Sequence, residues 1–130
     1  MYEVLIIDDD SRNIFALKAT LASKGYSCFT SLSAKEGIDI LQKNAGIKVV
    51  LLDMMMPEMD GYEALSIIKN DKTIHKIPVI AVTAQAMVGD KEKCLQAGAD
   101  EYVSKPINVD ELLGKLDKFK NYNSDRKMGI

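Results

Sequence analysis

Three apolar runs in this chain each end at a polar side chain that can do chemistry. The first run stops at Asp8-Asp9-Asp10, the second at Asp53 and the third at Thr83. Short apolar runs of this kind are typical of strands buried on both faces, as in parallel sheets covered by helices. Because ligands of open α/β sheets bind at the carboxyl ends of the strands, we expect the three ends to meet at one site around Asp53.

Carboxylates that meet at such a site repel one another. Two unit charges about 4 Å apart interact by about 4 kcal/mol at an effective dielectric of about 20. A cluster of this kind needs a cation, shifted pKa values, or both. An all-oxygen site with room for water suits Mg²⁺, or Mn²⁺ in its place. Lys105 supplies a second positive charge and Thr83 a hydroxyl donor.

A carboxylate nucleophile, a divalent ion, a lysine and a hydroxyl donor are the parts that phosphoryl transfer needs. The product on Asp53 would be an aspartyl phosphate. Each signal alone has a simpler explanation, since the acidic run could cap a helix, Thr83 could be a strand-end hydroxyl and Lys105 a solvated charge. Their joint position at successive strand ends favours the phosphoryl-transfer site.

The elements that must position these residues alternate along the chain. Strands are expected at residues 2–7, 26–30, 47–52, 79–82 and 101–104, and helices begin near residues 10, 33, 60, 90 and 108. The resulting order, βαβαβαβαβα with short connections, predicts a parallel sheet with helices on both faces. A capping residue followed three positions later by Glu marks three of the helix starts, at Ser33 and Glu36, Asp60 and Glu63, and Asn108 and Glu111.

Composition bounds the class of protein. The chain has 130 residues, 47% of them hydrophobic and 28% charged, which predicts one globular domain. A net charge of −2 argues against direct nucleic-acid binding. The sequence shows no signal peptide and no apolar stretch of the roughly 20 residues that span a bilayer, so we expect a cytoplasmic protein without membrane insertion.

The last ten residues differ from the rest. From Asn121 to Ile130 the periodic pattern dissolves into polar and charged residues, so we expect the domain to cover residues 1–120 and residues 121–130 to form a polar tail or the start of a linker. Cys28 and Cys94 are expected to pack as buried thiols rather than to pair. His75 is expected to lie in solvent.

The motifs together resemble a receiver domain of the two-component response regulators, over about residues 2–120. The matching segments are Ile7-Asp8-Asp9, Leu52-Asp53, Met56-Pro57-Glu58-Met59-Asp60-Gly61, Val82-Thr83-Ala84 and Tyr102-Val103-Ser104-Lys105-Pro106. The resemblance implies a flavodoxin-like (βα)5 fold, a doubly wound parallel sheet with strand order 2-1-3-4-5. It also implies a signalling module that catalyses only its own phosphorylation and dephosphorylation.

The resemblance implies a role for each motif residue. Asp53 would accept a phosphoryl group from a phosphohistidine of a sensor histidine kinase or a histidine phosphotransfer protein. Asp9 and Asp53 would bind Mg²⁺ directly, together with the backbone carbonyl of Met55, and Asp8 would act through water.

Other residues would recognise and report the phosphoryl group. Thr83 and Lys105 would hold its oxygens, and the bond before Pro106 would be cis. Tyr102 matches an aromatic position that turns inward when Thr83 moves towards the phosphate. That motion would switch the surface formed by the fourth helix, fifth strand and fifth helix for a downstream effector that the sequence does not name.

Two features refine the resemblance. Residues 84–94 look most like the receivers of hybrid sensor kinases. Many receivers carry a polar residue where this chain has Met55. The difference leaves the metal ligand intact, because that ligand is a backbone oxygen. It affects the rate of autodephosphorylation, because the side chains of Met55 and Gln85 would border the path of the attacking water.

Two alternatives belong to other classes. A haloacid-dehalogenase-like phosphatase would use Asp8 as nucleophile in an Asp-x-Asp pattern with Asp10, but Gly and Thr do not follow Asp10 and no acidic pair closes the metal site downstream of Lys105. A phosphate-independent docking domain would keep the fold without the chemistry, and would bind its partner equally well with Asp53→Asn.

Overall fold

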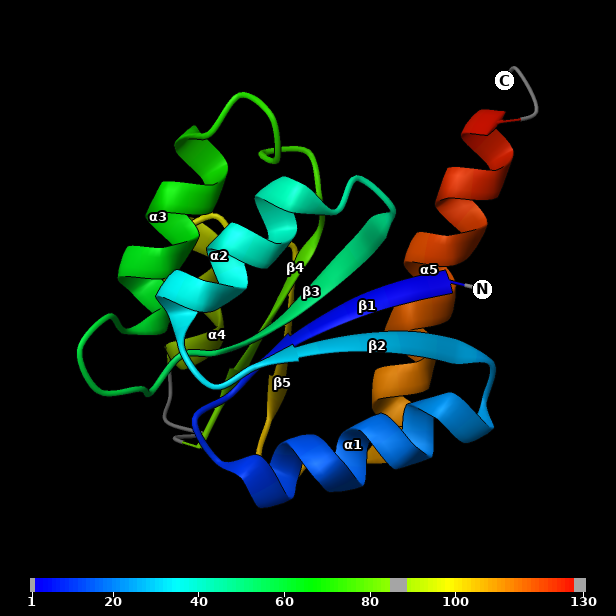
Figure 1. The fold of residues 1–130 in the computed structure, drawn as a ribbon, viewed down its shortest axis with the longest axis horizontal. Helices are drawn as coiled ribbons and strands as arrows, with labels where there is room; N and C mark the ends of the chain where they lie inside the picture. Colours follow the sequence, from blue (N-terminus) through cyan, green and yellow to red (C-terminus); the bar gives the residue numbers. More distant parts are fainter. Residues whose placement is uncertain (1, 85–88, 128–130) are drawn as a thin grey trace.

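The structure is a computed structural model that describes residues 2–84 and 89–127, with side chains described as far as Lys120. Strands and helices alternate along the chain (Figure 1). The strands are β1 (Tyr2–Ile7), β2 (Tyr26–Ser31), β3 (Ile47–Asp53), β4 (Val79–Thr83) and β5 (Glu101–Ser104); the helices are α1 (Ser11–Ser23), α2 (Ala34–Lys43), α3 (Gly61–Asn70), α4 (Asp90–Gln96) and α5 (Val109–Lys127).

The five strands form one parallel sheet in the order β2-β1-β3-β4-β5, which confirms the fold expected from the sequence. The chain first moves outward from β1 to β2, then returns to place β3 on the other side of β1. The crevice between the carboxyl ends of β1 and β3 is the switch point at which ligands of such sheets bind.

Alternate residues of each strand enter opposite cores. Val4 and Ile6 pack with α1 and α5, whereas Leu5 and Ile7 pack with α2, α3 and α4. Figure 1 shows these two groups of helices on opposite sides of the sheet. Since each Leu or Ile buried in this way contributes about 1.5–3 kcal/mol, the two-sided burial fixes the register that aligns the strand ends.

The helix starts follow the expected caps with one correction. Asp60 Oδ1 accepts a hydrogen bond from Glu63 N (2.9 Å), and Asn108 Oδ1 accepts one from Glu111 N (3.0 Å). Ser33 Oγ accepts from Glu36 N (3.2 Å), but the reciprocal half of the capping box is absent among the described contacts. The N–H of Ser33 is bound instead by Oγ of Ser31 (3.2 Å), a residue that folds back from the end of β2.

The last helix is longer than the sequence pattern predicts. α5 continues through Lys127, although apolar periodicity ends near residue 120. Residues 121–127 contain neither Gly nor Pro, so nothing stops a helix that is already nucleated and anchored by its earlier turns. The boundary of the domain at residue 120 remains a prediction.

The remaining predictions concern isolated side chains and membrane spans. Cys28 on β2 and Cys94 on α4 are free thiols, as expected, although only Cys94 is buried and Cys28 is half-buried. His75 is exposed, as expected. Within the described part of the chain, no helix combines the length and apolar character that crossing a bilayer requires.

Candidate functional site

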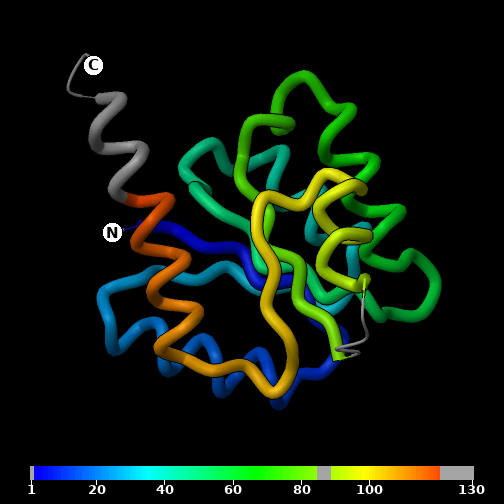
Figure 2. Tube along the Cα trace, turned by 180° about the vertical axis from the view of Figure 1, so that it is seen from behind, coloured from blue at the N-terminus to red at the C-terminus, as the bar shows by residue number. Residues whose placement is uncertain are grey.

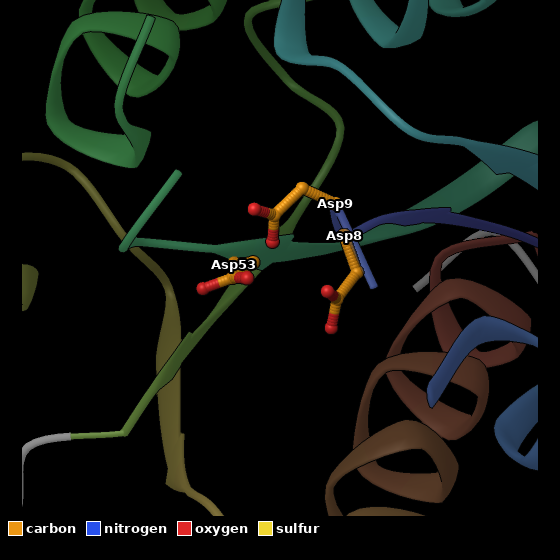
Figure 3. A group of neighbouring side chains, drawn as sticks. All are labelled: Asp8, Asp9 and Asp53. Carbon is orange, nitrogen blue, oxygen red and sulfur yellow. The ribbon is translucent and has the colours of Figure 1, made fainter. Parts of the chain in front are cut away.

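The acidic residues meet because β1 and β3 are neighbours in the sheet. Ile7 lies beside Leu52 in the register of the two strands, so Asp8 and Asp53 follow side by side at their carboxyl ends. Asp8, Asp9 and Asp53 each offer a carboxylate oxygen within 4.8 Å of the other two (Figure 3). We call this group the acidic pocket. Asp8 and Asp53 are buried, and Asp9 is exposed to solvent.

The donor set of the acidic pocket fits a hard divalent cation. Three carboxylates supply only oxygen atoms, and the exposed Asp9 leaves the pocket open to water, which Mg²⁺ retains in most protein sites. Softer metals prefer sulfur or imidazole ligands, and none belongs to this group.

Lys105 enters the acidic pocket from the loop that follows β5. Its Nζ lies 3.2 Å from Oδ2 of Asp8 and 3.3 Å from Oδ2 of Asp53. Burial opposes the charged ammonium, but the charges of Asp53 and Asp8 outweigh it and raise the pKa of Lys105. Among the described residues, Lys105 alone faces the two buried carboxylates, and the carboxylate of Asp9 lies beside them, which leaves the pocket with an excess of negative charge.

The surroundings of Asp53 disfavour its charged form and fix the position of its carboxylate. Burial raises its pKa, and the nearby charge of Asp8 adds to this, whereas the N–H of Met55 and the ammonium of Lys105 act in the opposite direction. Met55 N donates to Asp53 Oδ1 at 3.0 Å. Both oxygens of Asp53 therefore accept a hydrogen bond, Oδ1 from Met55 N and Oδ2 from Lys105 Nζ.

The loop after Asp53 is held by a close approach of the backbone. Met54 N donates to Val82 O (2.8 Å), and Gly61 N donates to Met54 O (3.2 Å). A Cβ atom at Gly61 would lie 2.4 Å from Cα of Met54 and 2.9 Å from the carbonyl oxygen of Asp53. Only glycine allows the start of α3 to close on the loop that carries Asp53.

Thr83 and Lys105 come together because β4 and β5 are paired. Thr83 lies opposite Ser104 in the register, and Lys105 N donates to Thr83 O at 2.7 Å. Thr83 is buried at the carboxyl end of β4. The bond between Lys105 and Pro106 is cis, the isomer that the resemblance implies.

Tyr102 lies apart from the acidic pocket. It is half-buried on β5, opposite Ala81, and packs against the core beneath α3 and α4. The structure thus joins Asp8, Asp9, Asp53 and Lys105 in one cluster, with Thr83 beside it and Tyr102 further along β5. Met55, whose N–H binds Asp53, is 50% exposed, and Gln85 lies outside the described residues.

Two supports of the acidic pocket were not predicted from the sequence. Asp8 N donates to Ser31 O (3.1 Å), and Asp8 Oδ1 accepts from Asp10 N (2.9 Å), so β2 and the start of α1 both fix Asp8.

A groove of about 520 Å³ also runs from Asp8 and Lys105 between α1 and the start of α5. No sequence signal indicates this groove, because its walls come from opposite ends of the chain.

Comparison with known proteins identifies the family. The model of the response regulator receiver domain matches residues 4–117, which is most of the chain. The chain belongs to the response regulator receiver domain family. The polar-differentiation response regulator DivK of Brucella ovis is 34% identical over 122 residues, covering 94% of this chain and 96% of the relative.

Solved receiver structures share the fold. A receiver domain protein from Clostridium thermocellum superposes with a TM-score of 0.86 at 30% identity, covering 95% of this chain and 98% of that one. The receiver domain of a sensor histidine kinase from Pseudomonas aeruginosa, solved with a magnesium ion coordinated in the active-site cleft, gives a TM-score of 0.82 at 31% identity, covering 91% and 96%.

Membership of this family has direct consequences. The chain is a receiver domain of a two-component system, a signalling module and not an enzyme with an external substrate. Receiver domains bind Mg²⁺ at an acidic pocket, and response regulators are generally phosphorylated by histidine kinases. Family membership argues against the phosphatase alternative with Asp8 as nucleophile. The narrower likeness to receivers of hybrid kinases stays a prediction.

Proposed function

We propose that this receiver accepts a phosphoryl group on Asp53 from a phosphohistidine of a sensor histidine kinase or a histidine phosphotransfer protein. A carboxylate oxygen of Asp53 attacks phosphorus, the bond between phosphorus and the imidazole nitrogen breaks, and the imidazole leaves with the electron pair. The observation that carries the proposal is the position of Asp53. Its buried carboxylate ends the central strand β3 and shares Lys105 with Asp8.

The residues of the acidic pocket would divide the work. Asp9 and Asp53, with the backbone carbonyl of Met55, would hold Mg²⁺, or Mn²⁺ in its place, and Asp8 would act through a bound water. When bound, the ion supplies positive charge that offsets both the carboxylates and the incoming phosphoryl oxygens. Lys105 is close enough to bind an oxygen of a phosphoryl group attached to Asp53, because its Nζ is 3.3 Å from Oδ2 of that residue.

The output would pass through β4 and β5. Thr83 would bind a phosphoryl oxygen through its hydroxyl, and Tyr102 would move inward in response, shifting the surface of α4, β5 and α5. The direct connection between Thr83 O and Lys105 N supports this coupling, since a shift at either residue is transmitted to the other strand. Binding of a downstream effector would then depend on the phosphorylation state.

The first test is phosphorylation by a small donor. The protein would be incubated with Mg²⁺ and acetyl phosphate, and its intact mass recorded for the parent chain, Asp53→Asn and Asp8→Asn. We expect one phosphoryl adduct that requires Mg²⁺ and is lost in Asp53→Asn. An adduct that survives Asp53→Asn but is lost in Asp8→Asn would contradict the proposal and favour the phosphatase hypothesis, in which Asp8 is the nucleophile.

The docking-domain alternative predicts a different result. No adduct from acetyl phosphate or from a phosphorylated histidine phosphotransfer domain, together with partner binding that Asp53→Asn leaves unchanged, would favour a phosphate-independent module. Circular dichroism of each variant would show that the loss of the adduct does not come from loss of the fold.

A further inference from the structure

A second group of polar side chains lies on the face of the sheet beneath α3 and α4, apart from the acidic pocket. Tyr62 of α3, Cys94 of α4 and Tyr102 of β5 pack against the same core. Figure 2, which views the molecule from behind, shows α4 beside β5. None of these residues except Tyr102 has a place in the function proposed above.

Tyr62 binds α4 to α3 from two directions. Its hydroxyl lies 3.6 Å from Sγ of Cys94, within hydrogen-bond distance for sulfur, and Nζ of Lys93 lies 4.7 Å from the centroid of its ring. The ring therefore has a thiol at its edge and a cation over its face. The Tyr62 hydroxyl already has a partner.

Asp90, the first residue of α4, has a side-chain oxygen with no hydrogen-bond partner among the described residues. Its Oδ2 is buried, and none of the described residues donates a hydrogen bond to it. A buried carboxylate oxygen left without a donor is unfavourable, and native structures rarely retain one without a reason. Within the described part of the chain, this oxygen is therefore a hydrogen-bond acceptor that is closed to solvent and has no donor.

Two tyrosine hydroxyls are within electrostatic reach of this carboxylate. Burial is the main cause that raises the pKa of Tyr62 and of Tyr102, and the negative charge of Asp90 raises both further. The Tyr62 hydroxyl is held against Cys94, so we take the Tyr102 hydroxyl, which packs against the same core from β5, as the donor for Asp90. Tyr102 stands opposite Ala81 on β4, two residues before Thr83, so it lies on the strand pair that carries the proposed switch.

We propose that Oδ2 of Asp90 accepts a hydrogen bond from the Tyr102 hydroxyl in the phosphorylated state, and that this bond fastens α4 to β5. The inference rests on the proposed function, since it assigns a partner to the movement of Tyr102. In the present structure Oδ2 of Asp90 accepts no hydrogen bond from the described residues, and this unmet acceptor disfavours the conformation seen here. Formation of the bond favours the other state, so by linkage any group that mimics phosphate on Asp53 binds more tightly when Asp90 and Tyr102 are both intact.

The experiment measures that linkage on the full chain. With Mg²⁺ present, beryllofluoride, an analogue of the phosphoryl group, would be titrated and its apparent Kd obtained by fluorine NMR. Asp90→Ala and Tyr102→Phe should each weaken binding about tenfold, the equivalent of one hydrogen bond to a charged group. The double variant should be no weaker than either single variant, because both changes remove the same bond.

A matched control separates the two tyrosines. Tyr62→Phe removes a hydroxyl from the same cluster and should leave the apparent Kd of the parent unchanged. Loss of affinity in Tyr62→Phe but not in Tyr102→Phe would overturn the proposal, and so would losses that multiply in the double variant. If Asp90→Ala lacks a cooperative thermal transition, Asp90→Asn replaces it, with a smaller but still non-multiplying loss, because an amide oxygen is a weaker acceptor.

The same titration distinguishes this inference from the function on which it rests. Binding by the parent chain that is lost in Asp53→Asn but unaffected by Asp90→Ala and Tyr102→Phe would overturn only the role of Asp90. Absence of binding by the parent chain, or equal binding by Asp53→Asn, would overturn the proposed function and this inference together.

Discussion

Lys105 at the carboxyl edge of the sheet and Lys69 at the amino edge have side chains that are equally exposed, 22% each, yet their surroundings differ. Lys105 faces the two carboxylates of Asp8 and Asp53. Lys69 faces one carboxylate, that of Asp100 at 2.9 Å, and two backbone carbonyls, those of His75 and Ile77 at 3.4 and 3.3 Å.

The difference lies in how the opposite charge is satisfied. Oδ2 of Asp100 also accepts from Val79 N at 2.8 Å, so the carboxylate at the amino edge has a cation and a backbone donor, and the charges there balance within the chain. At the carboxyl edge, Asp8 and Asp53 share Lys105 and the carboxylate of Asp9 lies beside them, so among the described residues negative charge is in excess and its balance requires a cation from outside. One edge is thus complete and holds the fold together, while the other is ready to bind a cation and a phosphoryl group.

Glu101 extends the balanced pattern of the amino edge. This residue begins β5, and its carboxylate lies 3.1 Å from Nζ of Lys115 and 3.5 Å from Nζ of Lys118, both on α5. Burial opposes its ionisation, but the hydrogen bond and charge of Lys115, with help from Tyr102 N and Lys118, outweigh burial and lower the pKa of Glu101. The two lysines thus tie α5 to the edge strand.

The largest effect should come from removing the lysine of the acidic pocket. Lys105→Met is expected to slow formation of the phosphoryl adduct on Asp53 from acetyl phosphate about 100-fold, the usual effect of removing one preorganised donor to a developing charge. The rate would be followed by intact mass at saturating Mg²⁺. Lys118→Met, which removes an exposed lysine on α5, serves as the control and should keep the parent rate. A Lys105→Met variant that reacts at the parent rate would show that the two edges do not differ in function.

The second effect concerns stability at the opposite edge. Lys69→Met is expected to lower the free energy of unfolding by about 1–3 kcal/mol, because two carbonyls and one carboxylate lose a charged donor. Urea denaturation monitored by circular dichroism measures the change, and adduct formation on the same sample should remain at the parent rate. If Lys69→Met reduced phosphorylation as strongly as Lys105→Met, the division between a structural and a functional edge would fail.

The smallest effect is a pH dependence at Glu101. A carboxyl with a lowered pKa in the folded chain stabilises the fold above its unfolded value, 4.5 for Glu, and loses that contribution as pH falls through the lower folded pKa. The free energy of unfolding of the parent should therefore exceed that of Glu101→Gln at neutral pH, by up to about 1 kcal/mol for a partly exposed pair. The difference should shrink as pH falls below 4.5 and should also decrease in high salt. A difference that is constant from neutral to acidic pH would attribute the effect to packing instead of charge.

The acidic pocket was largely predictable because its information is local. Apolar runs that stop at Asp8, Asp53 and Thr83 locate strand ends in the sequence itself, and parallel strands place their carboxyl ends at the same edge of a sheet. The caps Asp60 and Asn108 were predictable for the same reason, since a capping side chain and the amide that it binds are three residues apart.

Contacts between distant segments were not predictable in this way. Ser31 displaces Glu36 as the partner of Ser33 N, and the same residue holds Asp8 through its carbonyl, because β2 lies beside β1 in the sheet. The length of α5 was underestimated for a related reason. Apolar periodicity reports the packing of a helix against a core, and it is silent about turns that continue past the core.

The sequence by itself determined the order of the elements, the strand ends and the residue types that meet there, since these depend on the period of side-chain burial and on short-range hydrogen bonds. Only the tertiary structure decided which charges are balanced. The proximity of Lys105 to two carboxylates, the carbonyls around Lys69 and the unused oxygen of Asp90 all depend on distances between segments far apart in the chain. Electrostatic energies vary steeply with such distances and with burial, and neither is encoded in residue spacing.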